Sequence, residues 1–116
     1  MEITRQSSCW CWVDPQKLQR LIRTSPATRQ LDRLLVAAVI EARSCERLAL
    51  LAEGLGKTPL GGMYRDLAQS EEGHQRLFFR LAAKCSGEEL ASARLSQLVD
   101  HERRILAEVG LRAAIH

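Results

Sequence analysis

Apolar residues recur every three or four positions over most of this chain, and no stretch alternates apolar and polar residues as a β-strand does. A period of that length predicts amphipathic helices that each bury one face. It is sustained over residues 28–53, 59–85 and 88–109, and over a shorter stretch after residue 14. The pattern therefore predicts an all-α fold.

Two helix starts are marked by capping residues. Asp14 offers an N-cap side chain before Pro15, a residue favoured at the first helical position, and predicts a short helix that ends around residues 24–26. Thr58 and Pro59 repeat the combination and predict the start of the second long helix.

Glycines mark the predicted helix ends. Gly54 and Gly56 are expected to end the first long helix, and Ser86 with Gly87 separates the second from the last. Because a short turn joins the two long helices, we expect an antiparallel αα-hairpin, with the last helix folding back alongside it. Such a thin bundle is expected to bury its apolar faces against something further, such as a second copy.

Length and composition fit one small domain. The chain has 116 residues, of which 46% are hydrophobic, 27% charged and 4% aromatic, so one core can form but not a second lobe. Residues 13–116 are expected to form this domain, and residues 1–12, which lack a helical period, are interpreted as a poorly specified tail. The net charge of +3 permits contact with a polyanion such as RNA without requiring one.

The sequence favours a cytoplasmic protein. It contains neither an apolar run long enough to cross a bilayer nor a signal-peptide pattern. Its four cysteines, Cys9, Cys11, Cys45 and Cys85, lack the spacing of a disulfide scaffold and are expected to be reduced thiols. Half of a zinc site at Cys9 and Cys11 is the alternative, but no CxxC or His follows at a suitable spacing.

Glu41 lies within the apolar face of the first long helix. At about 100° per residue it points the same way as six small or apolar residues. These are Leu34, Ala37, Ala38, Cys45, Leu48 and Ala52. Glu46 falls on the outer side, towards Arg43 and Glu53, where a solvated acid is expected. Because a buried, unpaired carboxylate is costly, Glu41 needs a compensating positive charge.

The second long helix repeats the situation at Glu71, with His74 beside the same face one turn later. The other members of that face are Leu60, Tyr64, Leu67, Ala68, Phe78, Ala82 and Cys85. Glu72 points outward, four residues before a natural partner in Arg76. Tyr64 is placed to hydrogen-bond near a metal, although a tyrosine on a helix core more often serves packing.

A metal cation is the compensation that this pattern favours. The arginines and lysines of these two helices fall mainly on their outer faces, so an internal arginine–glutamate pair is not expected. Carboxylates with an imidazole suit iron or manganese, and Glu facing Glu-x-x-His is half of the dinuclear set of four-helix bundles. Glu41, Glu71 and His74 are therefore the predicted ligands. The alternative is packing, because ExxH occurs by chance in many helices.

The last helix adds an ambiguous acid, Glu102, which shares a stripe with Leu98, Ile105 and Val109, with His101 at its edge. A largely solvated turn is the favoured interpretation, because Asp100, Arg103 and Arg104 lie nearby. Hydrogen-bonding support of a metal-bound histidine by Glu102 or His101 is the alternative.

Two strings, VAAVIEARSCERLALLAEGL at residues 36–55 and MYRDLAQSEEGHQRLFFRLA at residues 63–82, closely resemble the second half of the bacterial tRNA 2-methylthio-isopentenyladenosine hydroxylase family, MiaE. IEARSCER is the most specific part of the match. The similarity extends from about Val13 through RLSQLVDHERRIL, which ends at residue 106.

This resemblance implies a ferritin-like di-iron monooxygenase. Members use O₂ and an external electron donor to hydroxylate the isopentenyl group of a modified adenosine beside the tRNA anticodon. Carried over by motif, Glu41 is the single carboxylate, Glu71 bridges the metals and His74 is the terminal imidazole. The family usually has a bulkier residue at Gly73, and glycine costs about 1 kcal/mol in a helix, so a looser ligand turn is expected.

The resemblance also implies missing ligands. The family takes another Glu and another ExxH from two earlier helices, whereas residues 1–30 contain only Glu2 and Asp14 as acids and no His. One interpretation is a truncated gene product with an unusual start, whose other half is absent or separately encoded. The other is a symmetric homodimer, in which two copies supply four Glu and two His.

The function expected from the resemblance is therefore tRNA hydroxylation, with tRNA on outward arginines. The candidates are Arg43, Arg47, Arg65, Arg76 and Arg80. A charged helix face is more often merely solvated, so the assignment of an enzyme stays open. The alternatives are an inactive helical fragment and a ferritin-like metal-binding dimer without tRNA activity.

Overall fold

The fold comes from a computed structural model that describes residues 13–115, with side chains described to residue 110. It contains the helices α1 (Pro15–Gln19), α2 (Pro26–Leu55), α3 (Pro59–Ser86) and α4 (Glu88–Ile115). No strand occurs in residues 13–115, so the predicted all-α fold is confirmed. None of the helices in that range combines the length and apolar character needed to cross a membrane. The tail predicted for residues 1–12, with Cys9 and Cys11, lies outside the described residues.

Both predicted N-caps are present. The Asp14 carboxylate accepts a hydrogen bond of 3.0 Å from the Gln16 N–H, and the Thr58 hydroxyl accepts one of 3.1 Å from the Gly61 N–H. α1 is shorter than predicted. It ends at Gln19 because the backbone N–H of Arg23 donates to the Asp32 carboxylate at 2.9 Å rather than to a helical carbonyl.

Glycine ends α2 and closes the turn to α3. α2 continues through Gly54, so the predicted stop at Gly54 is wrong, and Gly56 is the C-cap with a φ of 60°. A Cβ on Gly61 would lie 2.5 Å from the Gly56 carbonyl oxygen, so α3 can begin this close to the turn only with a glycine there. The predicted break at Gly87 is confirmed, and α4 runs six residues beyond the predicted end, to Ile115.

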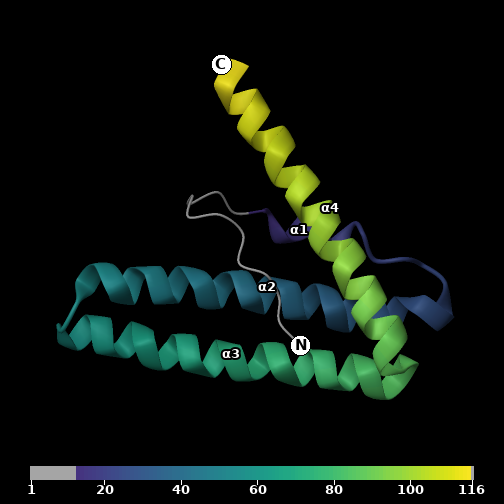
Figure 1. Cartoon of the computed structure of the whole chain (residues 1–116), viewed down its shortest axis with the longest axis horizontal. Coiled ribbons are helices and arrows are strands. Elements are labelled where there is room, and N and C mark those ends of the chain that lie inside the picture. Colours follow the sequence, from purple (N-terminus) through teal and green to yellow (C-terminus); the bar gives the residue numbers. More distant parts are fainter. Residues whose placement is uncertain (1–12, 116) are drawn as a thin grey trace.

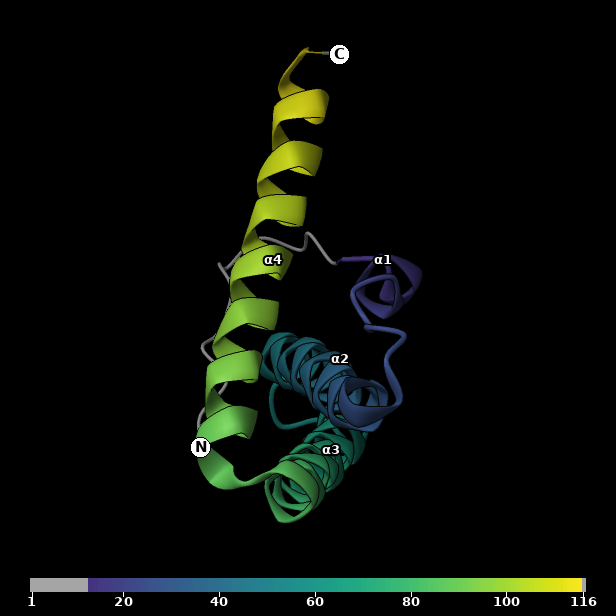
Figure 2. The same ribbon diagram turned by 90° about the vertical axis from the view of Figure 1, so that its right-hand side faces the viewer.

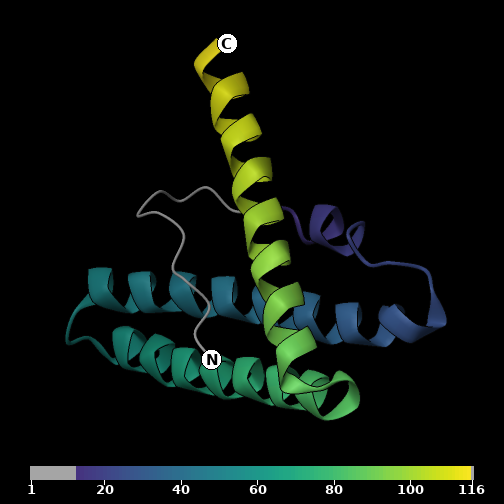
Figure 3. The ribbon, with the colours of Figure 1, turned by 45° about the vertical axis from the view of Figure 1, so that its right-hand side comes forward.

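α2 and α3 lie side by side and antiparallel, which confirms the αα-hairpin (Figure 1). α4 does not fold back alongside them, so that prediction is wrong. It crosses the hairpin steeply, and its C-terminal end projects well away from α2 and α3 (Figure 2). α1 lies along α2 on the side away from α3 (Figure 3).

The buried core occupies one end of the hairpin. It joins residues 31–42 of α2 to Phe79 and Ala82 of α3, residues 91–99 of α4, and Leu18 of α1. Towards the α2–α3 turn, α2 and α3 pack on each other and on no other described helix, and large apolar side chains of α3 remain exposed there. The hairpin is thus covered on one side and open on another.

A fully buried acid, Asp32, ties three segments together. Arg23 donates to Asp32 through Nε and Nη2 at 2.9 Å, and Arg94 of α4 donates through Nε at 2.9 Å and Nη2 at 3.0 Å. Burial by itself raises the pKa of Asp32, but these hydrogen bonds outweigh it and hold the pKa at about 2, below the usual 3.8. Asp32 is therefore an anion that fixes α4 and the α1–α2 connection against α2.

A second buried ion pair overturns four expectations. Arg43 is 4% exposed and donates to both Glu102 oxygens at 2.8 Å and to Glu46 at 2.7 Å. Arg43 is therefore not an outward residue free to meet tRNA, Glu102 is not solvated, and an internal arginine–glutamate pair does exist. Glu46 is half-buried rather than solvated. The cause is the steep crossing of α4, which covers a side of α2 that helical spacing alone places outside.

Arg43 stays a cation in this pair. Burial lowers the pKa of Arg43, but the hydrogen bonds and charges of Glu102 and Glu46 outweigh it and raise the pKa above its ordinary value. Two buried ion pairs thus join α4 to α2 beside the apolar core, and removing one partner of either pair would leave an uncompensated charge.

We expect Asp32→Asn to lower the free energy of unfolding at pH 7 by about 3 kcal/mol, because two arginines lose their buried anion. The pKa of Asp32 is lower in the folded than in the unfolded chain. Its contribution is therefore complete above pH 4 and is lost as the pH falls through the folded pKa of about 2. That loss is about 2 kcal/mol.

Urea unfolding followed by circular dichroism at pH 7 and between pH 4 and 2 measures both effects. Asp100→Asn, at an exposed position on α4, is the matched control and should change little. Parallel pH curves for Asp32→Asn and the unsubstituted chain would contradict the assignment.

Candidate metal centre

The hairpin brings the three predicted ligands together at mid-length. Glu41 stands near the middle of α2, and Glu71 and His74 stand near the middle of α3. Glu71 and His74 share a face because residues three apart are neighbours on a helix. One ligand atom from each residue can be chosen so that all lie within 4.8 Å of one another. The geometry therefore allows one cation to contact all three.

Glu41 carries an unsatisfied oxygen. Its side chain is 26% exposed, yet Oε2 is buried and accepts no hydrogen bond from any described residue. The neighbouring His74 Nδ1 lies 3.9 Å away, too far for a hydrogen bond. An orphaned buried oxygen costs about 1–3 kcal/mol, more for a charged group. A bound cation would remove that cost, so these residues fit a metal.

The centre is open on the α3 side. The His74 side chain is 58% exposed and Glu71 is half-buried, whereas the Ala38 and Ala42 positions beside Glu41 are buried. Three protein ligands are fewer than iron or manganese binds, and the exposed side leaves room for further ligands. The three residues therefore form one side of a candidate metal centre.

The thiol of Cys45, one turn after Glu41, links the two helices. Its Sγ donates to the Ala68 carbonyl oxygen at 3.2 Å. Burial first, and then the negative charges of Glu72 and Glu46, raise the pKa of this thiol. Because a metal binds the thiolate rather than the thiol, Cys45 is a packing residue beside the centre.

The outward neighbour of Glu71 behaves as predicted. Glu72 accepts a hydrogen bond of 2.7 Å from Arg76, and both side chains are more than half exposed. Such an exposed pair contributes little to stability. Glu72 is therefore a suitable control for substitutions of Glu71.

The three residues predicted to support the metal ligands, Glu102, Tyr64 and His101, have different surroundings. Both carboxylate oxygens of Glu102 accept hydrogen bonds from Arg43. Tyr64 and His101 are half-buried, and the structure gives neither a hydrogen bond to the three ligands. Their support of a ligand stays a prediction. α3 continues unbroken through Gly73, where an added Cβ would meet nothing within 4 Å.

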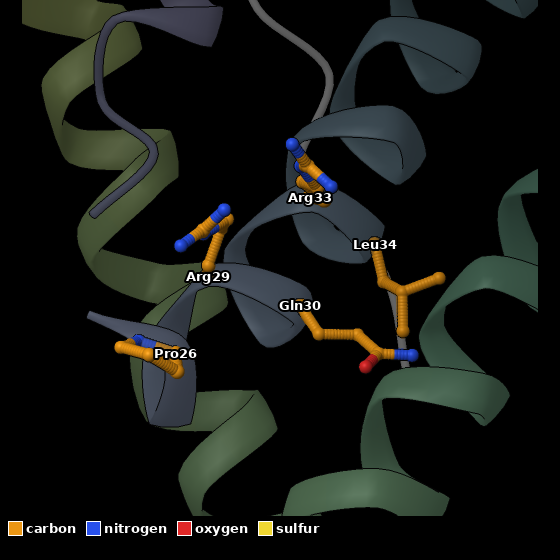
Figure 4. A pocket seen from close by; sticks show the side chains of 5 residues that line it. All are labelled: Pro26, Arg29, Gln30, Arg33 and Leu34. Carbon is orange, nitrogen blue, oxygen red and sulfur yellow. The ribbon is translucent and has the colours of Figure 1, made fainter. Parts of the chain in front are cut away.

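Two arginines that sequence reasoning did not select, Arg29 and Arg33, line a depression of about 550 Å³ on the N-terminal half of α2. Its other lining residues are Pro26, Gln30 and Leu34, with Gln30 and Leu34 reaching towards α3 (Figure 4). Arg33 also lines a second depression of about 350 Å³ with Ile22 and Ile40. The sequence feature that could have indicated this depression is the spacing of Arg29 and Arg33, which places two arginines one helical turn apart.

The exposed sequence candidates lie elsewhere. Arg47, Arg65, Arg76 and Arg80 are exposed as predicted, with Arg65 donating to the Gly56 carbonyl oxygen at 3.0 Å. Contact of these side chains with tRNA stays a prediction.

Comparison with known proteins gives one family. The model of the family described as tRNA-(MS[2]IO[6]A)-hydroxylase (MiaE) matches residues 14–116. A tRNA 2-(methylsulfanyl)-N(6)-isopentenyladenosine(37) hydroxylase of Pseudomonas putida is 42% identical over 82 residues, which are 71% of this chain and 39% of that protein. A hydroxylase of the same name from Salmonella typhimurium is 37% identical over 73 residues, 63% of this chain and 27% of that protein.

The matched segment thus spans well under half of each curated relative. No solved structure gives a significant match.

The unsatisfied Glu41 oxygen should lower the stability of the metal-free protein. We expect Glu41→Leu to raise its free energy of unfolding by about 1–3 kcal/mol, because a buried unsatisfied oxygen is removed. Glu72→Leu should stay within about 0.5 kcal/mol of the unsubstituted chain. Urea unfolding in the presence of a chelator measures both. A Glu41→Leu protein that is less stable than Glu72→Leu would show that Glu41 is already satisfied without a cation.

Proposed function

This chain belongs to the MiaE family, and on that premise we propose that it forms one half of a non-haem di-iron monooxygenase acting on tRNA. The proposed reaction is hydroxylation of the isopentenyl group of a 2-methylthio-isopentenyladenosine near the anticodon. The names of the relatives support the substrate.

The observation that carries the proposal is the orphaned Glu41 oxygen between Glu71 and His74. Two carboxylates and an imidazole within 4.8 Å are a suitable donor set for iron. The hairpin that presents them folds with a buried carboxylate oxygen that no described side chain satisfies. A purely structural helix pair would have no reason to retain that arrangement.

The bound iron would supply O₂ activation, which side chains do not provide. One oxygen atom enters a C–H bond and the other leaves as water, so the reaction consumes two electrons and two protons from an external donor. The chain itself contributes Glu41, Glu71 and His74 as ligands. Buried alanines beside Glu41 and the half-buried Phe78, one turn after His74, keep the ligand group in apolar surroundings.

A complete dinuclear set requires ligands from outside this chain. The family pattern adds a further Glu and a further ExxH, and two sources can provide them. One is a second copy of the chain and the other is a separately encoded N-terminal half.

For tRNA we propose contact with the depression beside Arg29 and Arg33. Guanidinium groups bind phosphate oxygens in bidentate fashion, and two of them at one depression form a suitable backbone contact. Arg33 precedes Glu41 by eight residues, about 12 Å along α2, which keeps such a contact close to the metal centre.

We expect the purified chain to bind about one iron per chain when loaded with Fe(II) without oxygen. Glu71→Gln and His74→Ala should each weaken binding on the order of 100-fold, whereas Glu72→Gln should not. Iron is measured by a colorimetric chelator after gel filtration. Hydroxylation of tRNA carrying the modified nucleoside is measured by mass spectrometry with O₂ and a reductant.

The outcomes separate the candidate functions. Iron binding with hydroxylation supports the proposal, and iron binding without hydroxylation favours a metal-binding protein without tRNA activity. A protein that binds neither iron nor manganese, alone or with an added N-terminal half, would be the inactive helical fragment.

We expect Arg29→Glu with Arg33→Glu to weaken tRNA binding and to reduce the slope of log affinity against log salt by about two. Lys57→Glu, at an exposed position in the α2–α3 turn, is the control for Arg29→Glu and Arg33→Glu taken singly, because each of these substitutions changes the charge equally. The same change at Arg47, Arg65, Arg76 and Arg80 tests the other exposed arginines. Filter binding over a salt series is the measurement. Equal losses for Lys57→Glu and for Arg29→Glu or Arg33→Glu alone would indicate only a net-charge effect.

A further inference from the structure

The open side of the metal centre is apolar. Five large side chains of α3 remain 40–49% exposed: Leu60, Met63, Leu67, Leu77 and Leu81. At 100° per residue they fall within an arc of about 100°, and His74 falls inside the same arc. The exposed ligand thus stands in the middle of an exposed apolar stripe, which we call the α3 stripe.

Within residues 13–115, neither α1 nor α4 covers this stripe. Asp32 and Arg43, which hold α4, are about 180° and 200° from Glu41 around α2. α4 and α1 therefore pack on the far side of α2. An exposed apolar strip of this length on a small protein marks an interaction surface.

The α3 stripe is symmetric about its ligands. Leu67 precedes Glu71 by four residues, and Leu77 follows His74 by three. Further out, Met63 precedes Glu71 by eight residues, and Leu81 follows His74 by seven. Leu60 precedes Glu71 by eleven residues, and the exposed Cys85 follows His74 by eleven. A two-fold axis between Glu71 and His74, perpendicular to α3, therefore sets each apolar residue opposite its counterpart in an antiparallel second helix.

We infer that a second copy of this chain docks on the α3 stripe and completes the metal centre. The inference rests on the proposed function, because it names the partner of the same centre. The two-fold axis places Leu67 of one copy opposite Leu77 of the other and brings two sets of Glu41, Glu71 and His74 together. The pair then holds four carboxylates and two imidazoles, a full dinuclear set.

The size of the contact suits a stable dimer. From Leu60 to Cys85 the stripe is about 37 Å long, and the hairpin is two helices wide, so each copy covers on the order of 700 Å². A standard specific interface buries about 800 Å² per partner. Because Glu41 and His74 stand near mid-length of their helices, the two hairpins overlap along their full length.

Analytical ultracentrifugation of the chain tests the dimer. We expect a mass of twice 13.0 kDa at micromolar concentration. Leu67→Glu with Leu77→Glu should raise the dissociation constant at least about 100-fold while the helix content by circular dichroism is kept. Leu90→Glu, at a 63% exposed position on α4 outside the stripe, should leave the dimer intact. A monomer at 100 µM, or a dimer unaffected by the double variant, would overturn the inference.

Crosslinking tests the register independently of metal. Leu60→Cys should form an intermolecular disulfide with Cys85 of the second copy under mild oxidation, seen as a covalent dimer on a non-reducing gel. Leu60→Cys combined with Cys85→Ser should return to the background of the unsubstituted chain. Equal crosslinking by both variants would rule out the proposed antiparallel pairing.

Metal content on the same samples distinguishes the two proposals. A dimer with the expected crosslink but without affinity for Fe(II) leaves the docking surface standing and removes the metal centre. A monomer that binds iron only after addition of a separately encoded N-terminal half removes the second copy and leaves the proposed function standing.

Discussion

The arrangement of this protein depends on how α4 is held against α2. Buried Asp32 pairs with Arg94 of α4, and buried Arg43 pairs with Glu102 of α4, so two ion pairs join the helices beside their shared apolar core. Ion pairs of this kind demand particular geometry, and they fix α4 at a steep angle on the side of α2 that faces away from Glu41. The opposite side of the hairpin is left open, and the candidate metal centre lies there.

Two acids on α2, Asp32 and Glu41, have different surroundings. Asp32 receives hydrogen bonds from Arg23 and Arg94, and its pKa is held at about 2. Glu41, two and a half turns later, has an apolar environment and an oxygen without a partner. Arginines thus neutralise the acid that holds the helices together, and no described arginine pairs with Glu41, where we propose that a metal binds. The proposed metal centre and the exposed apolar stripe are then explained together, because the proposed second copy covers both.

Family membership and the local geometry support each other, although the chain matches well under half of each curated relative. The similarity covers both helices of the hairpin, and Glu41, Glu71 and His74 meet within it. Membership by itself says nothing of what completes the centre. The apolar stripe of α3 and its symmetry about Glu71 and His74 supply that argument from the chain's own residues.

The sequence by itself determined the local structure and the grouping of the three candidate ligands. Asp14, Thr58 and Gly87 predicted helix boundaries because caps and breaks depend on a few neighbouring residues. The i, i+3 spacing of Glu71 and His74, with Glu41 on the preceding antiparallel helix, sufficed to bring three ligands together because helical period and a short turn fix that geometry. Only the tertiary structure decided the path of α4 and the burial of Arg43. Helical spacing places a residue on a face but cannot say which distant helix covers it, so ion pairs between residues 59 positions apart were beyond prediction.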